Sequence, residues 1–117
     1  MVTAELLVDT DVLVDHLRGT HRLPSGAGPL GVSVVTRCEL FAGRDDSEGL
    51  RHFLSPMIEY PIDTPVAELA GLTRRRTGIA TPDALIAATA LLHRLPLVTR
   101  NRRHFERVDA LRVVWPD

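Results

Sequence analysis

The chain of 117 residues contains no lysine and a single cysteine. With Cys38 as the only thiol, no disulfide can form within the chain, and we expect a small buried side chain there rather than a reactive one. All fourteen basic residues are therefore arginines. The absence of lysine excludes any site that needs a lysine to hold a phosphoryl group.

Aromatic residues are also scarce, with one tryptophan, one tyrosine and three phenylalanines, which disfavours a base-stacking platform. We expect Phe105 and Trp115 to be packing residues. No apolar run approaches the ~20 residues that span a bilayer. The N-terminal segment 1–17 carries acids and lacks a basic leader, so we expect no signal peptide. Length and composition predict one soluble, cytoplasmic domain over residues 1–117.

The net charge of −1 excludes a broad nucleic-acid-binding surface and leaves only local basic patches. One arginine cluster covers residues 74–76, and a solvated helix face explains it as well as binding does. The other cluster consists of Arg100, Arg102 and Arg103, beside His104. Guanidinium groups donate hydrogen bonds in a planar fork that suits phosphate, so this second cluster is a candidate for phosphate contacts.

Short apolar segments alternate with segments of helical periodicity along the chain. Strands are predicted at residues 5–8, 31–35, 57–62, 97–99 and 111–115, and helices at residues 10–18, 36–42, 47–54, 65–77, 81–95 and 102–107. Residues 19–29, rich in glycine and proline, are predicted to form a loop. This alternation predicts an α/β fold with a mostly parallel sheet and helices on both faces.

The segment 81–95 is the strongest predicted helix. Thr81 is expected as its N-cap and Pro82 at its first helical position. The segment is apolar on nearly every side, so we expect it to be buried. His16 and His93 also fall within apolar helical patterns, and packing rather than catalysis is expected for both.

Acidic and polar residues follow the predicted strands. Asp9 comes directly after the first strand, Glu39 lies in the first turn of the helix after the second, and Asp83 lies in the first turn of the longest apolar helix. In open parallel sheets, ligands bind outside the carboxyl ends of the strands, so we expect Asp9 and Glu39 at that edge. Asp83 joins them if its helix begins there, which the strand predicted at 97–99 permits. Thr99 and Asn101 leave the same edge.

Each acid also has a purely structural explanation. Asp9 can cap the helix that follows it, and Asp83 suits the positive end of a helix dipole. Thr36 and Glu39 fit a capping box. Three ionised carboxylates at one edge repel one another, however, unless a cation is present. Mg²⁺ or Mn²⁺ would remove that repulsion and would activate a water for phosphodiester hydrolysis.

Four stretches carry a family resemblance: LVDTDVLVDHL (7–17), SVVTRCELFAG (33–43), TPDALIAATALLHRLPLVTRNRRHFERV (81–108) and LRVVWP (111–116). In this order they resemble the PIN-domain family, and within it the VapC toxins of bacterial toxin–antitoxin pairs. They cover more than half of the chain. The most specific stretch is 81–108, in which an acid opens an alanine-rich helix and a strand then leads to Thr-x-Asn before His-Phe.

The resemblance implies a PIN-like three-layer α/β/α fold with a central, mostly parallel sheet of about five strands. It also implies an endoribonuclease toxin dependent on Mg²⁺ or Mn²⁺, which commonly cuts tRNA or rRNA. Asp9, Glu39 and Asp83 match the family's acidic metal-site residues, and Thr99 matches its site hydroxyl. The implied partners are the RNA substrate, a cognate VapB-type antitoxin that blocks the site, and a second copy of the chain in a homodimer.

The sequence departs from the family pattern at two places. Asn101 stands where many relatives carry a fourth acid, so we expect one firm metal site and a weaker second one. Asp11 is open to two interpretations, either supplying the missing charge or being an ordinary polar residue in a first helical turn. The loop 19–30 is shorter than in many relatives, which affects the grooves for RNA and antitoxin. We expect one or two of the arginines at 100–103 to contact RNA phosphates.

Two other interpretations stay open. LVDTDVLVD (7–15) also resembles the Asp-x-Asp motif of haloacid dehalogenase-like phosphatases, but that family, like the response-regulator receivers, relies on a lysine that this chain lacks. Alternatively, the chain is a PIN domain that binds RNA or antitoxin without cutting. Asn101 favours this second interpretation, whereas the three acids at the strand exits argue against it.

Overall fold

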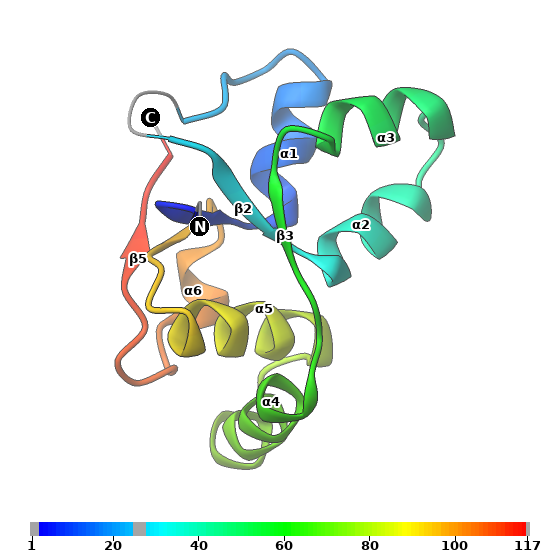
Figure 1. Ribbon diagram of the computed structural model, residues 1–117. Coiled ribbons are helices and arrows are strands. Elements are labelled where there is room, and N and C mark those ends of the chain that lie inside the picture. Colours follow the sequence, from blue (N-terminus) through cyan, green and yellow to red (C-terminus); the bar gives the residue numbers. More distant parts are fainter. Residues whose placement is uncertain (1–2, 25–27, 117) are drawn as a thin grey trace.

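Five strands form one sheet between two layers of helices (Figure 1). The computed structural model describes residues 3–24 and 28–116. The strands are β1 (Leu6–Val8), β2 (Leu30–Ser33), β3 (Ile58–Tyr60), β4 (Leu97–Val98) and β5 (Val113–Val114). The helices are α1 (Thr10–Leu17), α2 (Val34–Phe41), α3 (Ser47–Leu54), α4 (Thr64–Thr77), α5 (Thr81–Leu92) and α6 (Arg102–Phe105).

All neighbouring strands run parallel, in the order β3-β2-β1-β4-β5. β1 lies in the middle, where Leu7 pairs with Gly31 of β2 on one side and with Leu97 of β4 on the other. Helical crossovers return the chain between parallel strands, so all five carboxyl ends meet at one edge. The predicted three-layer α/β/α fold with a parallel sheet of five strands is confirmed.

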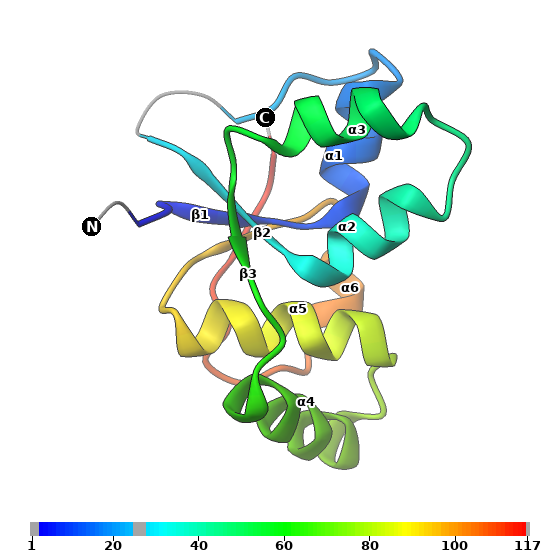
Figure 2. The same cartoon turned by 45° about the vertical axis from the view of Figure 1, so that its right-hand side comes forward.

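The two faces of the sheet bury alternate residues of its central strands. Leu7 and Leu97 pack against α5 and α6, together with Phe105. Val8 and Val98 point to the opposite face and pack against α1, α2 and α3. Figures 1 and 2 show these two groups of helices on opposite sides of the sheet, with α4 lying outside α5. Each such fully buried side chain contributes about 1.5–3 kcal/mol through the hydrophobic effect.

Helix α2 begins earlier than the sequence predicted. Ser33 is its N-cap, and the Ser33 hydroxyl accepts a hydrogen bond from the backbone N–H of Val35 at 3.1 Å. The predicted strand 31–35 is therefore wrong at its end, because Val34 and Val35 are helical. A cap hydrogen bond outweighs the modest preference of valine for strands.

The ends of α5 also differ from the prediction, although its burial is confirmed. Thr81 is the first helical residue, whereas Ala80 occupies the N-cap position and makes no side-chain cap bond. The helix ends at Leu92 rather than Leu95. Arg94 has a positive φ of 56°, a left-handed backbone conformation that no right-handed helix can continue.

Two of the predicted packing residues lie at the surface. Cys38 is exposed, and Trp115 is 50 % exposed, so the expectations of burial for both are wrong. Phe105 is 1 % exposed and is confirmed as a core residue. An exposed tryptophan is the more informative exception, because its large apolar ring is left facing water.

Both histidines expected to pack do so against aromatic rings. The ring of His16 stacks on Phe53 with a centroid separation of 5.6 Å. The ring of His93 lies 4.4 Å from that of Tyr60, centroid to centroid. Neither histidine lies among the residues that line the acidic pocket described below.

The predicted loop 19–29 contains no helix or strand in the part that the structure describes, and its residues 25–27 lie outside the described residues. Among the described helices, none combines the length and the apolar character that a membrane crossing needs.

Glycine at position 31 is required by close packing in the middle of the sheet. A Cβ there would lie 2.9 Å from the Cβ of Ala4, 2.9 Å from a ring carbon of Tyr60 and 3.1 Å from the carbonyl oxygen of Leu6. Gly31→Ala is therefore expected to lower the free energy of unfolding by roughly 1–3 kcal/mol, as measured by urea denaturation. Gly71→Ala is the matched control.

A Cβ on Gly71, in α4, would meet no atom within 4 Å. Because alanine favours the helical backbone over glycine, Gly71→Ala should raise the free energy of unfolding by about 1 kcal/mol. Equal effects of the two substitutions would contradict the packing described for Gly31.

Candidate active site

An open pocket of about 400 Å³ lies at the carboxyl edge of the sheet. Its walls bring together segments far apart in the sequence, from the start of α1 to the start of α6. The lining residues are Asp9, Thr10, Asp11, Val14, Asp15, Arg18, Glu39, Asp83, Asn101 and His104. The acids expected to converge at this edge, Asp9, Glu39 and Asp83, therefore do share one pocket.

Asp9 is the most deeply buried of these acids, at 5 % exposed. Its Oδ2 accepts a hydrogen bond from the Thr99 hydroxyl at 2.7 Å, and its Oδ1 accepts one from the backbone N–H of Thr10 at 2.9 Å. Asp9 is also the N-cap of α1, so its structural explanation holds as well. Burial, and next the charge of Asp11, raise the pKa of Asp9 to about 7.

Asp11 and Asn101 are joined across the pocket. Oδ2 of Asp11 accepts hydrogen bonds from the backbone N–H of Arg100 at 3.1 Å and from the amide of Asn101 at 3.0 Å. Its Oδ1 is buried without a hydrogen-bond partner among the described residues. Burial also raises the pKa of Asp11. The Asn101 amide thus holds the Asp11 carboxylate in the pocket.

Glu39 does not form the predicted capping box. Its Oε1 accepts a hydrogen bond from the Thr10 hydroxyl at 2.6 Å, and the same hydroxyl lies 2.9 Å from that of Thr36. Thr36 is fully buried within α2 and caps nothing. The capping-box prediction failed because Ser33 already caps this helix, which leaves Glu39 available to the pocket.

Asp83 lies in the first turn of α5, as predicted. Its Oδ2 lies 3.2 Å from Nδ1 of His104 in α6. Burial raises the pKa of Asp83, the nearby His104 opposes that shift, and the charge of Glu39 adds to it. Asp83 and Glu39 therefore lie near enough to interact through their charges.

The donor set consists of oxygen atoms, which hard divalent cations prefer. In the arrangement described for residues 3–24 and 28–116, no three acid, histidine or cysteine side chains already surround a common point closely enough to hold an ion. Each carboxylate instead has a hydrogen-bond donor nearby. Burial raises the pKa of Asp9 and of Asp11, and Oδ1 of Asp11 has no hydrogen-bond partner among the described residues. An added cation would therefore be favoured in this pocket, although Arg18 and His104 also line it.

A second pocket, of about 410 Å³, adjoins the first and shares Asn101 and His104 with it. The arginines predicted to contact phosphate, Arg100, Arg102 and Arg103, all line it. The guanidinium of Arg100 is already engaged, because it donates to Asp15 and lies 3.1 Å from Nδ1 of His21.

The sequence alone gave no role to three side chains that this edge brings together. Thr10 positions Glu39, His104 approaches Asp83, and Asp15 binds Arg100. The available signal was the proximity of Thr10 and Asp15 to Asp9 in LVDTDVLVD. Their partners lie up to 85 residues away, beyond the reach of local patterns.

The fold and the pocket together define the class of protein: a parallel α/β/α domain with an acidic site at the carboxyl edge of its sheet. The PIN-domain family model matches residues 6–111, and the chain belongs to that family. It is 37 % identical over 120 residues to Ribonuclease VapC10 of Mycobacterium tuberculosis, covering 92 % of this chain and 90 % of that protein. It is 35 % identical over 113 residues to Ribonuclease VapC19 of the same organism, covering 85 % and 90 %.

Solved structures agree with this assignment. The chain superposes on a toxin–antitoxin complex from Klebsiella pneumoniae with a TM-score of 0.81 and 32 % identity, covering 93 % of this chain and 95 % of that one. Its fold also matches VapBC2 from Rickettsia felis bound to a promoter DNA fragment, with a TM-score of 0.79 at 20 % identity. The predicted membership of the VapC group of PIN domains is confirmed, and the phosphatase interpretation is set aside.

The raised pKa of Asp9 predicts a specific pH dependence of stability. With a pKa of about 7 when folded and 3.8 as its ordinary value, Asp9 binds its proton more tightly in the folded chain. Stability from this group is thus present at low pH and is lost as the pH rises from about 4 to about 7. Asp9→Asn should remove that loss, raising the free energy of unfolding at pH 8 by up to roughly 4 kcal/mol.

Urea denaturation of both proteins in a chelator, at pH values from 4 to 8, measures this effect. Asp45→Asn, which removes an exposed acid outside the pocket, controls for the change in net charge. Parallel stability curves for the wild-type protein and Asp9→Asn would show that Asp9 is ionised normally.

Proposed function

We propose that this protein is a cytoplasmic VapC-type endoribonuclease that hydrolyses RNA phosphodiester bonds with Mg²⁺ or Mn²⁺. The observation that carries the proposal is the convergence of Asp9, Glu39 and Asp83 on one open pocket at the carboxyl edge of the sheet. The relatives VapC10 and VapC19 bear the name ribonuclease, which supports the same activity here.

Asp9, Glu39 and Asp83 are the proposed ligands of the cation. The divalent ion would lower the pKa of a water and neutralise charge on the reacting phosphate. The Thr99 hydroxyl fixes the Asp9 carboxylate by its 2.7 Å hydrogen bond, and Thr10 fixes Glu39 in the same way. These threonines act as positioning residues, because each orients a carboxylate through a hydrogen bond; Thr10 also lines the pocket, whereas Thr99 lies behind Asp9 and is fully buried.

The charges of the pocket support a cation in that place. Asp9, Asp11 and Asp83 all have raised pKa values, with burial as the first cause. Each is therefore more costly to ionise than an exposed acid, and a cation offsets that cost. The oxygen of Asp11 without a partner offers a further acceptor, for the ion or for one of its waters.

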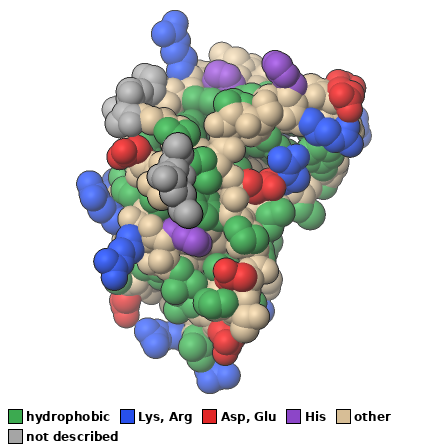
Figure 3. Space-filling view, viewed as in Figure 1, with side chains coloured by type: hydrophobic (Ala, Val, Ile, Leu, Met, Phe, Trp, Pro, Cys, Tyr) green, Lys and Arg blue, Asp and Glu red, His purple; other side chains and the backbone are tan. Residues whose placement is uncertain are grey.

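The substrate and partners proposed here follow from the family. We propose structured RNA, such as tRNA or rRNA, as the substrate, a VapB-type antitoxin as the neutralising partner, and a homodimer as the assembly. The structural relative from Klebsiella pneumoniae is a toxin–antitoxin complex, which supports the antitoxin. Figure 3 shows hydrophobic side chains at the surface among charged ones. Leu72 in α4 and Leu92 in α5 are 49 % and 44 % exposed, and a second protein chain would remove such side chains from water.

A non-catalytic PIN domain is the second candidate function, and Asn101 is the observation that favours it. Its amide contributes no charge where many relatives have an acid. Asp11 offsets this difference, because Asn101 itself holds the Asp11 carboxylate in the pocket. We therefore favour the catalytic function.

The cleavage prediction concerns Asp9→Asn. Purified wild-type protein with Mg²⁺ or Mn²⁺ should cut RNA. Asp9→Asn should cut roughly 100-fold more slowly or worse, because Asp9 is a proposed metal ligand. Removing a residue that only supports a metal ligand already lowers activity by up to about 100-fold. A chelator should stop the wild-type reaction, and Asp45→Asn should cut at the wild-type rate. Sequencing of the RNA ends then identifies the substrate. Equal cleavage by wild-type protein and Asp9→Asn would indicate a contaminant and a non-catalytic domain.

The number of bound ions tests the role of Asn101. Calorimetric titration with Mn²⁺ should give one firmly bound ion per wild-type chain, because the pocket lacks the fourth acid at this position. Asn101→Asp adds a carboxylate beside Asp11 and should bind a second ion more tightly than the wild-type chain does. An identical stoichiometry and affinity for both proteins would argue against Asn101 as part of the ion site.

A further inference from the structure

We propose that the pocket beside the acidic one binds an unpaired nucleotide of the RNA, with its base stacked on Trp115 and its phosphate held by Arg102 and Arg103. This inference rests on the proposed ribonuclease function and names the feature of the substrate that the site selects: a flexible, unpaired base next to the bond that is cut. The expectation that Trp115 serves only as a packing residue is thereby replaced.

The position of Trp115 follows from the sheet topology. Trp115 directly follows β5, the outermost strand on this side of β1, so it lies at the same edge as Asp9 and Thr99. β4 separates β5 from β1, and neighbouring strands lie about 4.8 Å apart, so Trp115 is displaced from Asp9 by about 10 Å along the edge. A short run of nucleotides can span that separation.

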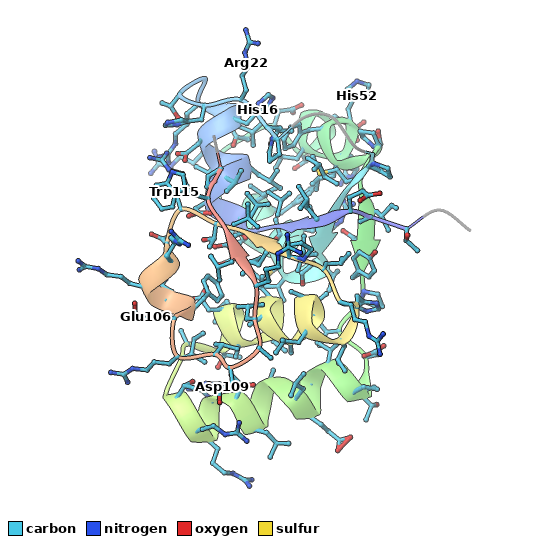
Figure 4. The ribbon with its side chains drawn as sticks, turned by 90° about the vertical axis from the view of Figure 1, so that its left-hand side faces the viewer. His16, Arg22, His52, Glu106, Asp109 and Trp115 are labelled. Atoms are coloured by element: carbon cyan, nitrogen blue, oxygen red, sulfur yellow. The ribbon has the colours of Figure 1, made fainter. Side chains whose placement is uncertain are left out.

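The exposure of Trp115 suits a stacked ligand. The indole is 50 % exposed, and it lies between two hollows of the surface. One is the pocket of about 410 Å³ that it lines with Arg100, Asn101, Arg102, Arg103 and His104. The other is a hollow of mixed character, lined by apolar side chains such as Leu23 and Val114 and by Arg22. Figure 4 shows Trp115 at the end of β5, on the side of the molecule where α6 lies.

The charge of the pocket that Trp115 lines is complementary to a bound RNA strand. Arg100 is engaged by Asp15, whereas Arg102 and Arg103 form no ion pair with any described residue. Free guanidinium groups next to an exposed aromatic ring are the combination that binds single-stranded nucleic acid, one for the backbone and the other for the base. The adjoining acidic pocket repels phosphate until a cation occupies it.

Because Trp115 is the only tryptophan of the chain, its fluorescence reports on this pocket directly. Titration of the slow-cutting Asp9→Asn protein with a short single-stranded RNA, in the presence of Mg²⁺, should quench the emission to saturation. An abasic strand of the same length, which has phosphates but no bases, should quench little. A double-stranded RNA of the same sequence should also quench little, because its bases are already stacked.

Variants separate stacking from charge. Trp115→Ala should weaken binding of the single strand, measured by anisotropy of labelled RNA, by roughly 5- to 150-fold, whereas Trp115→Phe should retain most of it. Arg102→Ala should weaken binding and reduce its dependence on salt, because fewer counterions are released. Arg75→Ala, an equal change of charge at an exposed site on α4, is the matched control and should leave both unchanged.

Three results would overturn the proposal. The first is RNA binding with no change in Trp115 fluorescence. If cleavage then still depends on Asp9, the ribonuclease function stands and the base binds elsewhere. The second is equal quenching by abasic and base-containing strands. The third is quenching by an acidic peptide but not by RNA, which would make the pocket a protein-binding site. If the wild-type protein with Mg²⁺ or Mn²⁺ neither cuts nor binds RNA, the proposed function itself is rejected.

Discussion

The burial of one carboxyl group among other acids is the constraint on which this site depends. Asp9 is 5 % exposed, yet it lies beside Asp11 and shares a pocket with Glu39 and Asp83. The two hydrogen bonds that it accepts do not offset its loss of solvation, because its pKa remains raised to about 7. A helix cap alone requires neither the burial nor the neighbouring acids, so the arrangement indicates function rather than stability.

The parallel sheet is what makes this crowding possible. β1 is the middle strand, and the residues that follow β1 and β4 meet although they lie 90 positions apart, as the Thr99–Asp9 hydrogen bond shows. Along the same edge the character of the surface changes, from acidic at β1 to basic and aromatic at β5. One edge therefore provides two adjacent environments of opposite charge, and Asn101 and His104 from the connection between β4 and β5 line both of them.

Much of this arrangement could be predicted from local patterns. The alternation of strands and helices predicted the parallel sheet. The positions of Asp9 and Glu39 after strands, and of Asp83 at the start of the helix before β4, predicted their shared pocket. The start of α2 could not be predicted from the valines before Thr36, because the Ser33 cap decides it.

The exposure of Trp115 could not be predicted either, since it depends on which element covers the end of β5. The hydrogen bonds within the pocket could not be predicted either. They join side chains whose positions are set by the packing of whole helices, as the bond between Thr10 and Glu39 illustrates. Patterns of a few residues therefore located the acids but not the partners that orient them.

The outer strands of the sheet have a consequence for the behaviour of the protein in concentrated solution. β3 has three residues and β5 has two, so each outer edge offers very few free backbone groups to another chain. Such short edge strands are poor templates for the edge-to-edge pairing of sheets that leads to fibres. With no lysine to place on these edges, the sheet is protected against polymerisation by the brevity of its outermost strands.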